Sequence, residues 1–234
     1  EYEYPLEGQD PENPIDVGRY NRTESAALAG LRLRLTSSLD MTAGVQGTRS
    51  EFVELPELRD NETYAILGGI HFDRPKFFLN LAGGYRKGYA LNNSLYDYQT
   101  PVGSYFLSWF VGGPVELQAF GHRRPGYSRS ALDQLYFELR YGGGVRLRLG
   151  SRVSLGGHAE AGTNSYPFSV SADGGERVDD AWSYGGDLSV RVLDRVVLRA
   201  NALQTVRRPP DPGVERKVFR FWTGLSFNGE FTRE

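Results

Sequence analysis

The sequence predicts an all-β protein, an antiparallel up-and-down transmembrane β-barrel of about twelve strands. Three observations predict this fold. Eleven stretches alternate apolar and polar residues with a period of two, so successive side chains face opposite sides of a strand. Short turns and long polar loops join these stretches alternately. Most stretches are longer than an ordinary strand and reach the roughly ten residues that cross a bilayer as a tilted strand.

The predicted strands follow one another along the chain without a linker-like break. They cover residues 24–36, 39–50, 62–73, 76–89, 102–112, 114–125, 133–149, 152–166, 180–193, 195–208 and 216–231. Short connections with turn chemistry permit only antiparallel hairpins and would face the periplasm: 37–38, 73–75, 112–114, 150–151 and 193–194. Longer polar connections would face the cell exterior: 51–61, 90–101, 125–132, 167–179 and 209–215.

Side-chain parity justifies the strands of the first half. In 24–36 and 76–89 the apolar residues oppose polar ones: Leu31, Leu33 and Leu35 against Arg32 and Arg34, and Phe77, Leu79, Leu81 and Tyr85 against Asn80 and Arg86. The stretch 102–112 is an exception, because Phe106 and Phe110 fall on the polar parity. One face therefore suits hydrocarbon and the other suits water.

The later strands repeat the pattern. The opposed sets are Leu135, Phe137, Leu139 and Val145 against Glu138, Arg140, Arg146 and Arg148; Val153 and Leu155 against Ser154, His158 and Glu160; Tyr184, Leu188 and Val190 against Ser183, Asp187 and Arg191; and Phe219, Phe221 and Leu225 against Arg220, Trp222 and Ser226. Aromatic residues gather toward the predicted ends of the strands, as two membrane interfaces would select.

Composition limits the function classes. No window approaches the roughly eighteen consecutive apolar residues of a membrane-spanning helix, and the net charge of −2 indicates neither nucleic acid nor an acidic partner. The absence of cysteine excludes disulfides, cysteine-bound zinc and thiol catalysis. A soluble barrel of about twelve strands would enclose a wider space than side chains can fill, so the membrane interpretation is favoured.

Eleven strands cannot give the even number usual in bacterial single-chain barrels. The alternating Glu1-Tyr2-Glu3-Tyr4 suggests the end of a first strand whose beginning precedes this chain, although an intact chain with an external N-terminus is the alternative. The predicted organisation is then residues 1–20 as the end of that strand plus an extracellular loop, and residues 21–234 as the barrel.

The polar parity is rich in arginine, which favours a water-filled pore that passes anionic solutes. The candidate pore-lining residues are Arg32, Arg34, Arg86, Arg140, Arg146, Arg148, Arg191, Arg199, Arg220, Glu138, Glu160 and His158. A competing interpretation is a plugged, structural barrel. Hairpin pairing would place Arg140 opposite or diagonal to Glu160, and would bring Asp187 near Arg199 and Asn201.

The sequence does not favour an enzyme. His71, His122 and His158 are the only histidines, and all three fall on the polar parity of separate strands without a local metal motif. Outer-membrane phospholipase A, another twelve-stranded barrel, works from the lipid-facing side, where this chain would place no histidine. We therefore predict no catalytic residues, no metal site and no cofactor.

Two segments, Ala82–Arg86 and the hairpin Leu31–Leu39, are similar to the putative beta-barrel porin families of Gram-negative bacteria, which are often associated with surface polysaccharide systems. Trp222–Phe227 resembles the C-terminal assembly signal of outer-membrane proteins, but three residues, Thr232 to Glu234, follow Phe231 and depart from that pattern. The strand number and the arginine-rich parity also resemble the twelve-stranded porins specific for acidic oligosaccharides.

These resemblances imply a bacterial outer-membrane location and recognition by the barrel-assembly machinery. We expect a porin-like channel that contacts membrane lipid and lets small solutes diffuse passively, favouring anions or acidic sugars. The alternatives are a non-conducting structural or partner-binding barrel that presents loops 51–61 and 167–179, and a polysaccharide export component. The sequence leaves the solute, the gating and the oligomeric state open.

Overall fold

The alternating stretches form one antiparallel sheet of eleven strands in the order of the sequence. The computed structural model describes residues 22–53, 56–127, 135–170, 176–193, 196–209 and 215–227. The strands are β1 (Arg22–Thr36), β2 (Leu39–Phe52), β3 (Asn61–Arg74), β4 (Phe77–Ala90), β5 (Tyr98–Gly112), β6 (Val115–Tyr127), β7 (Leu135–Leu149), β8 (Val153–Val170), β9 (Glu176–Leu193), β10 (Val196–Arg208) and β11 (Arg216–Phe227). A helical turn, α1 (Pro56–Arg59), and a 3₁₀ turn, η2 (Ser94–Tyr96), interrupt the described connections.

The predicted short turns are confirmed where the structure describes them. They fall at residues 37–38, 75–76, 113–114 and 150–152, each between strands paired antiparallel. Gly113 and Gly150 adopt positive φ values of 56° and 67°, a backbone conformation that glycine adopts without steric cost. These two glycines therefore let the chain reverse within a few residues.

The predicted loop 167–179 is wrong in its described part. Residues 167–170 extend β8 and residues 176–179 begin β9, so this hairpin continues well past its predicted ends. Proline and glycine made the segment resemble a loop, but Arg177 and Asp179 pair in register with Tyr166 and Asn164. Cross-strand pairing outweighs the weak strand propensity of these residues. The loop predicted at 90–101 is likewise shortened by the start of β5 at Tyr98.

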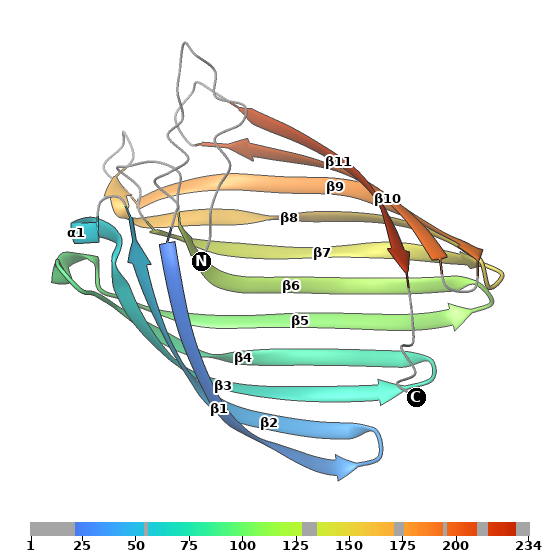
Figure 1. The fold of residues 1–234 in the computed structure, drawn as a ribbon, viewed down its shortest axis with the longest axis horizontal. Helices are drawn as coiled ribbons and strands as arrows, with labels where there is room; N and C mark the ends of the chain where they lie inside the picture. Colours follow the sequence, from blue (N-terminus) through green and yellow to red (C-terminus); the bar gives the residue numbers. More distant parts are fainter. Residues whose placement is uncertain are drawn as a thin grey trace, which may run out of the picture.

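The sheet is strongly curved, with one concave and one convex face (Figure 1). Its edges are β1 and β11, and the described residues of these two strands do not pair with each other, so the sheet is open. At the long-loop end the curl brings β2 against β6: the rings of Phe52 and Tyr127 lie 5.0 Å apart, and the Tyr127 hydroxyl donates a 3.0 Å hydrogen bond to Asn61 Oδ1. The predicted first-strand segment and loop, residues 1–20, lie outside the described residues.

Burial in this sheet is the reverse of that in a soluble protein. Large apolar side chains of the convex face are exposed, for example Leu31 at 81% and Ile66 at 71%. Buried side chains include many polar ones, such as Asp40, Thr63, Glu116 and Asn164. Apolar residues are the ones usually found inside a protein that folds in water, so the convex face lacks the environment that it needs.

Candidate functional site

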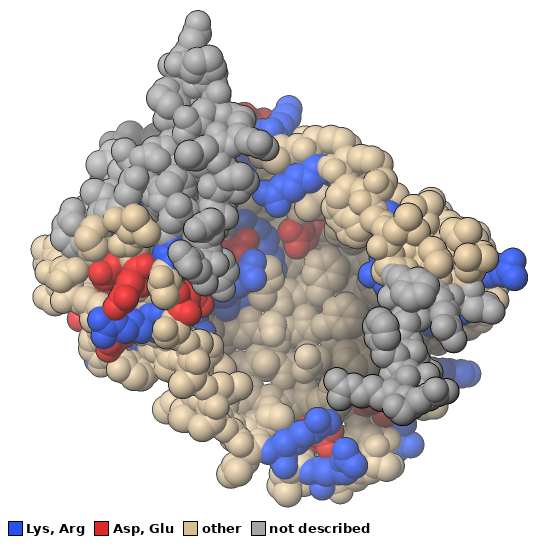
Figure 2. Space-filling view, in the orientation of Figure 1, with Lys and Arg blue, Asp and Glu red and all other residues tan. Residues whose placement is uncertain are grey.

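The strand register puts all the predicted pore-lining residues on one face of the sheet. Directly paired residues share a face, and the pairing can be followed from Arg32 and Thr42 in the first hairpin to Arg140, and on to Arg207 and Arg216 in the last. This is the concave face. In Figure 2 it forms a hollow with an uncharged floor, and charged side chains gather around that floor.

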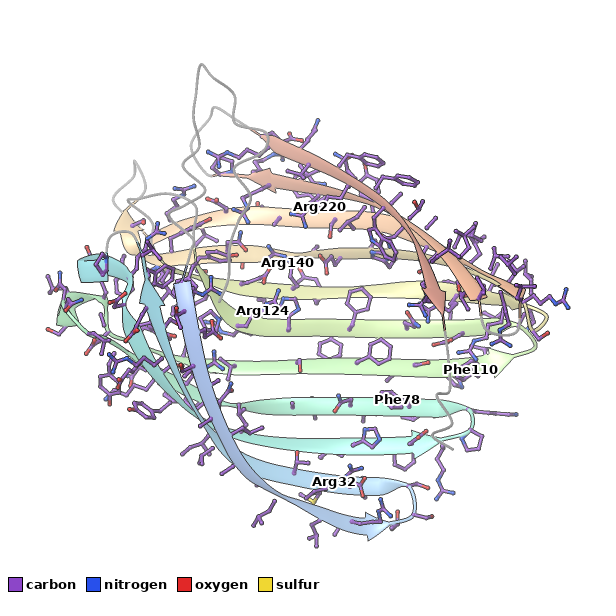
Figure 3. The ribbon with its side chains drawn as sticks, viewed as in Figure 1. Arg32, Phe78, Phe110, Arg124, Arg140 and Arg220 are labelled. Atoms are coloured by element: carbon purple, nitrogen blue, oxygen red, sulfur yellow. The ribbon has the colours of Figure 1, made fainter. Side chains whose placement is uncertain are left out.

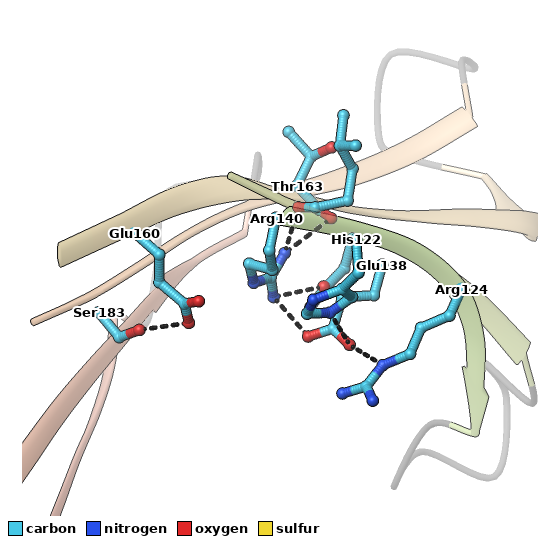
Figure 4. Close-up of polar contacts among 9 residues, drawn as sticks. His122, Arg124, Glu138, Arg140, Glu160, Thr163 and Ser183 are labelled. Atoms are coloured by element: carbon cyan, nitrogen blue, oxygen red, sulfur yellow. Dashed lines mark hydrogen bonds and ion pairs between the residues drawn. The ribbon is translucent and has the colours of Figure 1, made fainter. Parts of the chain in front are cut away.

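Glu138 on β7 is the centre of a polar cluster toward the long-loop end, which we call the long-loop cluster. It consists of His122, Arg124, Glu138, Arg140 and Asn164, and Figure 4 shows the first four of these side chains together. Arg124 Nε donates to Glu138 Oε2 at 2.9 Å, and His122 Nε2 lies 3.2 Å from the same oxygen. Arg140 lies 3.3 Å from Glu138 Oε1. One carboxylate therefore holds charged or polar groups from two strands.

Arg140 is the most enclosed arginine of this cluster. Its guanidinium donates hydrogen bonds to the carbonyl oxygens of Leu139 and Thr163, at 2.8 and 2.9 Å, and to Asn164 Oδ1 at 2.7 Å. The expected partnership of Arg140 with Glu160 is realised as a diagonal placement, since Arg140 pairs with Gly162 and Glu160 with Gly142. Glu160 instead accepts a hydrogen bond of 2.5 Å from the hydroxyl of Ser183.

Two smaller ionic clusters lie toward the short turns. Asp40 accepts hydrogen bonds from both Arg32 and Arg34, which stand on the neighbouring strand. Glu116 accepts from Ser108 at 2.7 Å, from Gln118 at 2.8 Å and from Arg148 at 2.9 Å. Each carboxylate is thus fixed by several donors.

Apart from the enclosed Arg140, the guanidinium groups lie outermost in these clusters. The side chain of Arg124 is 65% exposed above Glu138 at 17%, and that of Arg148 is 53% exposed above Glu116 at 5%. Arg191, Arg199 and Arg220 are also exposed, and no described carboxylate lies within ion-pair distance of them. The charged groups that the concave face exposes to solvent are therefore mainly cationic, even though its carboxylates neutralise part of the charge.

Asp187 occupies the position expected from the β9–β10 hairpin, directly opposite Asn201 and diagonal to Arg199. Its ion pair, however, is made on the other side of β9, with Arg146 at 3.7 Å. Arg146 reaches it across β8, where Gly156 carries no side chain in the way. Arg86 donates to Gln46 across β3 at 3.2 Å.

A recess of about 460 Å³ opens at the long-loop end of the same face. Its lining includes Arg86, Tyr98, Arg124, Tyr136 and Glu138.

Just outside the strands, Glu215 contacts Lys217 at 3.2 Å and Arg208 at 3.4 Å. The hydrogen bond from the Lys217 ammonium holds the pKa of the Glu215 carboxyl below its usual range, so this acid stays ionised and neutralised by cations.

An aromatic stripe crosses the concave face, from the short-turn end of β3 and β4 to the interior of β6 and β8. It is formed by His71, Phe78, Phe106, Phe120 and His158. Ring centroids are 5.1 Å apart for His71 and Phe78, 5.9 Å for Phe78 and Phe106, and 6.4 Å for Phe120 and His158. Phe106 and Phe120 are paired directly in the register. Figure 3 shows Phe78 between the arginines of the long-loop end and Arg32.

Sequence reasoning placed the arginines and histidines on the correct face but missed several residues of the site. Asp40 was missed because the parity of its strand was not compared with that of Arg32 and Arg34 across the turn. Phe78 was missed because Phe77 beside it set the apolar parity of the strand, although Phe78 itself shares the parity of Asn80 and Arg86. The parity of Phe106 and Phe110, like that of Trp222, was the signal in the sequence that pointed to aromatic residues on the polar face.

Within the described ranges, no helix is long and apolar enough to cross a membrane. Among the described side chains, no group of three or more histidine, cysteine or acidic residues is arranged to hold a metal ion. No protein-family model and no curated protein matches this chain.

Proposed function

We propose that this protein is an outer-membrane β-barrel channel through which small solutes diffuse passively, with a preference for anions. The cationic surface of the concave face carries this proposal. A water-filled pore needs a polar lining, and exposed guanidinium groups lower the electrostatic cost of passing an anion. Carboxylates held beneath those groups fix their positions and reduce their mutual repulsion.

The exposed apolar face supports a membrane environment. Side chains such as Leu31, Leu33 and Ile66 are largely exposed on the convex side, where lipid would cover them. Aromatic side chains mark both ends of that side: Tyr64 and Tyr89 pack at 6.2 Å toward the long loops, and Phe72 and Phe77 at 5.9 Å toward the short turns. Aromatic belts of this kind are typical of the two membrane interfaces.

Closure of the barrel follows from the same environment, since unpaired strand edges are not tolerated in hydrocarbon. Each strand reverses the direction of the one before, so β1 and β11 run in the same direction. An antiparallel seam between them requires one more strand running the opposite way. We therefore propose a twelve-stranded barrel in which that strand lies between β11 and β1.

The test is the current through the purified protein in a planar lipid bilayer. We expect discrete conductance steps in potassium chloride, and a reversal potential under a salt gradient that indicates preference for chloride. A protein that stays electrically silent over a wide voltage range would contradict the channel.

The reversal potential also tests which residues line the pore. Arg124→Gln should shift the reversal potential toward a preference for cations, and the shift should be larger at low salt, where charges are less screened.

Arg49→Gln is the matched control. Arg49 is an exposed arginine near the same end of the sheet, but the register puts it on the convex face, where it pairs with Glu51 and Glu62. Removing this charge should leave ion selectivity unchanged. Equal shifts in both variants would mean that the concave face does not line the path.

One observation favours a second candidate, a partner-binding barrel. The strands β8 and β9 each have 18 residues, well beyond the roughly ten that cross a bilayer, so their hairpin would project from the membrane. Co-purification from outer membranes, with and without a shortened β8–β9 hairpin, would separate the two functions. Loss of a specific partner together with an absence of conductance would favour the second.

A further inference from the structure

The aromatic stripe is continuous because glycines leave room for it. Phe120 on β6 and His158 on β8 meet across β7, where Gly142 and Gly144 present no side chain on the concave face. A Cβ atom at Gly144 would lie 3.2 Å from His158 Cβ. On β9, a Cβ atom at Gly185 would lie 3.2 Å from His158 Cε1 and 3.1 Å from Leu203 Cδ1. Leu203 thus extends the apolar stripe to β10.

Every ring of the stripe remains partly exposed toward the concave side. Phenylalanine gains nothing from facing water, and serine, threonine or asparagine would serve equally well on a face that only has to be wet. Partly covered rings gain stability when another apolar ring contacts them, and aromatic pairs prefer edge-to-face or offset arrangements. The stripe therefore fits the apolar ring of a solute.

The charges around the stripe indicate what else that solute carries. Arg146 is the next concave-facing residue after Gly144 on β7, about 7 Å further along the strand. Its guanidinium lies 3.7 Å from Asp187, and its Nε atom is buried without a hydrogen-bond partner among the described residues. The exposed Arg148 is the next concave-facing residue of β7 toward the short turn, and the exposed Arg124 lies on the neighbouring strand β6 toward the long loops. An anionic group beside the ring would complement these cations.

We propose that the aromatic stripe, together with Arg146, binds small aromatic monocarboxylates, with the ring at Phe120 and His158 and the carboxylate toward Arg146. This inference rests on the proposed channel, for which it names a class of solute. Binding is weak and rapidly reversible, since a channel site must release its solute. The phenyl rings of the stripe offer no hydrogen-bond partners to the hydroxyl groups of a sugar, so sugar acids of the same charge should bind less well than benzoate.

Equilibrium binding to the detergent-solubilised protein tests the site without requiring conduction. Benzoate binding, followed by titration calorimetry or by ligand-observed NMR, should exceed that of acetate, of glucuronate and of the neutral benzamide. The variant Phe120→Ala should weaken benzoate binding by about threefold to tenfold, as expected for the loss of one ring contact. Phe221→Ala removes the same side chain from the convex face and should leave binding unchanged.

Arg146→Gln separates the two halves of the site. It should weaken the binding of benzoate and leave the binding of benzamide unchanged, whereas Phe120→Ala should weaken the binding of both compounds. In bilayers, benzoate should reduce the chloride current of the wild-type protein more than acetate does at equal concentration. A conducting channel to which benzoate and acetate bind equally would overturn the inference and leave the channel intact. A silent protein that still binds benzoate at Phe120 would overturn the channel and keep the site.

Discussion

Glu138 shows how a single acid can organise several basic groups on a face rich in arginine. Its two oxygens contact Arg124, His122 and Arg140, and the Arg140 side chain is only 7% exposed. An enclosed guanidinium depends on its partners, because removing one partner of a buried pair leaves a charge without compensation. The backbone carbonyls that Arg140 also contacts replace part of this interaction but carry no full charge.

We expect Glu138→Ala to lower the free energy of unfolding by about 3 kcal/mol, toward the lower end of the range for a buried pair. Urea unfolding in lipid vesicles, followed by tryptophan fluorescence, measures the change. Glu51→Ala is the control: Glu51 also pairs with an arginine, Arg49, but both side chains are about half exposed, so the loss should stay below about 1 kcal/mol. Similar losses of stability in the two variants would show that the enclosed Arg140 does not depend on Glu138.

At the scale of elements, β7 combines two roles. Its even-numbered residues supply Glu138, Arg140, Arg146 and Arg148 to the concave face, and between them Gly142 and Gly144 leave a gap. The gap allows side chains of β6 and β8 to meet, so the strand connects the ionic clusters without interrupting the aromatic stripe. This is a steric requirement, independent of the backbone freedom of glycine.

Gly142→Ala should therefore destabilise the sheet by about 1–3 kcal/mol, the range for overpacking. The added Cβ would lie 2.7 Å from Glu160 Cβ, which is too close without a backbone shift. Gly157→Ala on β8 is a matched change, because its Cβ would meet only a carbonyl oxygen at 4.0 Å. Heat stability in vesicles, read from the shift in electrophoretic mobility on unfolding, compares the two. An equally stable Gly142→Ala protein would contradict the steric argument.

Strand positions were largely predictable because parity and turn chemistry are local properties. The short turns follow from segments such as Gly112–Pro114 and Gly150–Ser151, and most described strand ends fall within a few residues of the predicted ones. The far end of the β8–β9 hairpin was not predictable, since it depends on pairing between Tyr166 and Arg177. Partners within the site were equally hidden: parity places Glu160 on the concave face, but only the register selects Ser183 over Arg140.

At the scale of the whole molecule, the parallel direction of β1 and β11 makes the seam testable. If one strand lies between them, equivalent points are two strand spacings apart, about 9.5 Å, which is too far for a disulfide. The chain contains no cysteine, so any cross-link must come from the two cysteines introduced by mutation. We expect Ala29→Cys combined with Phe221→Cys or Thr223→Cys to resist direct oxidation and to react with a bifunctional maleimide of about 10 Å.

The outcome of this cross-linking is read by electrophoresis of the protein in vesicles. A disulfide formed on direct oxidation would mean that β1 and β11 are neighbours, which contradicts the twelfth strand. Failure of both reagents would mean that the edges stay apart and that the sheet is open in the bilayer. Cysteine pairs across β1 and β2, such as Ala29 and Val45, are directly opposite in the register and serve as the positive control.

The strictly consecutive strand order also bears on how fast this protein can fold. Every hairpin joins neighbours in the sequence, so each closes only a short segment of chain and costs little entropy. Growth of the sheet can therefore proceed hairpin by hairpin from several starting points. In the proposed barrel, joining the two outer edges through one more strand would be different in kind, because it brings together segments at opposite ends of the described chain. That single long-range event, more than any individual strand, should set the time needed to reach the finished structure.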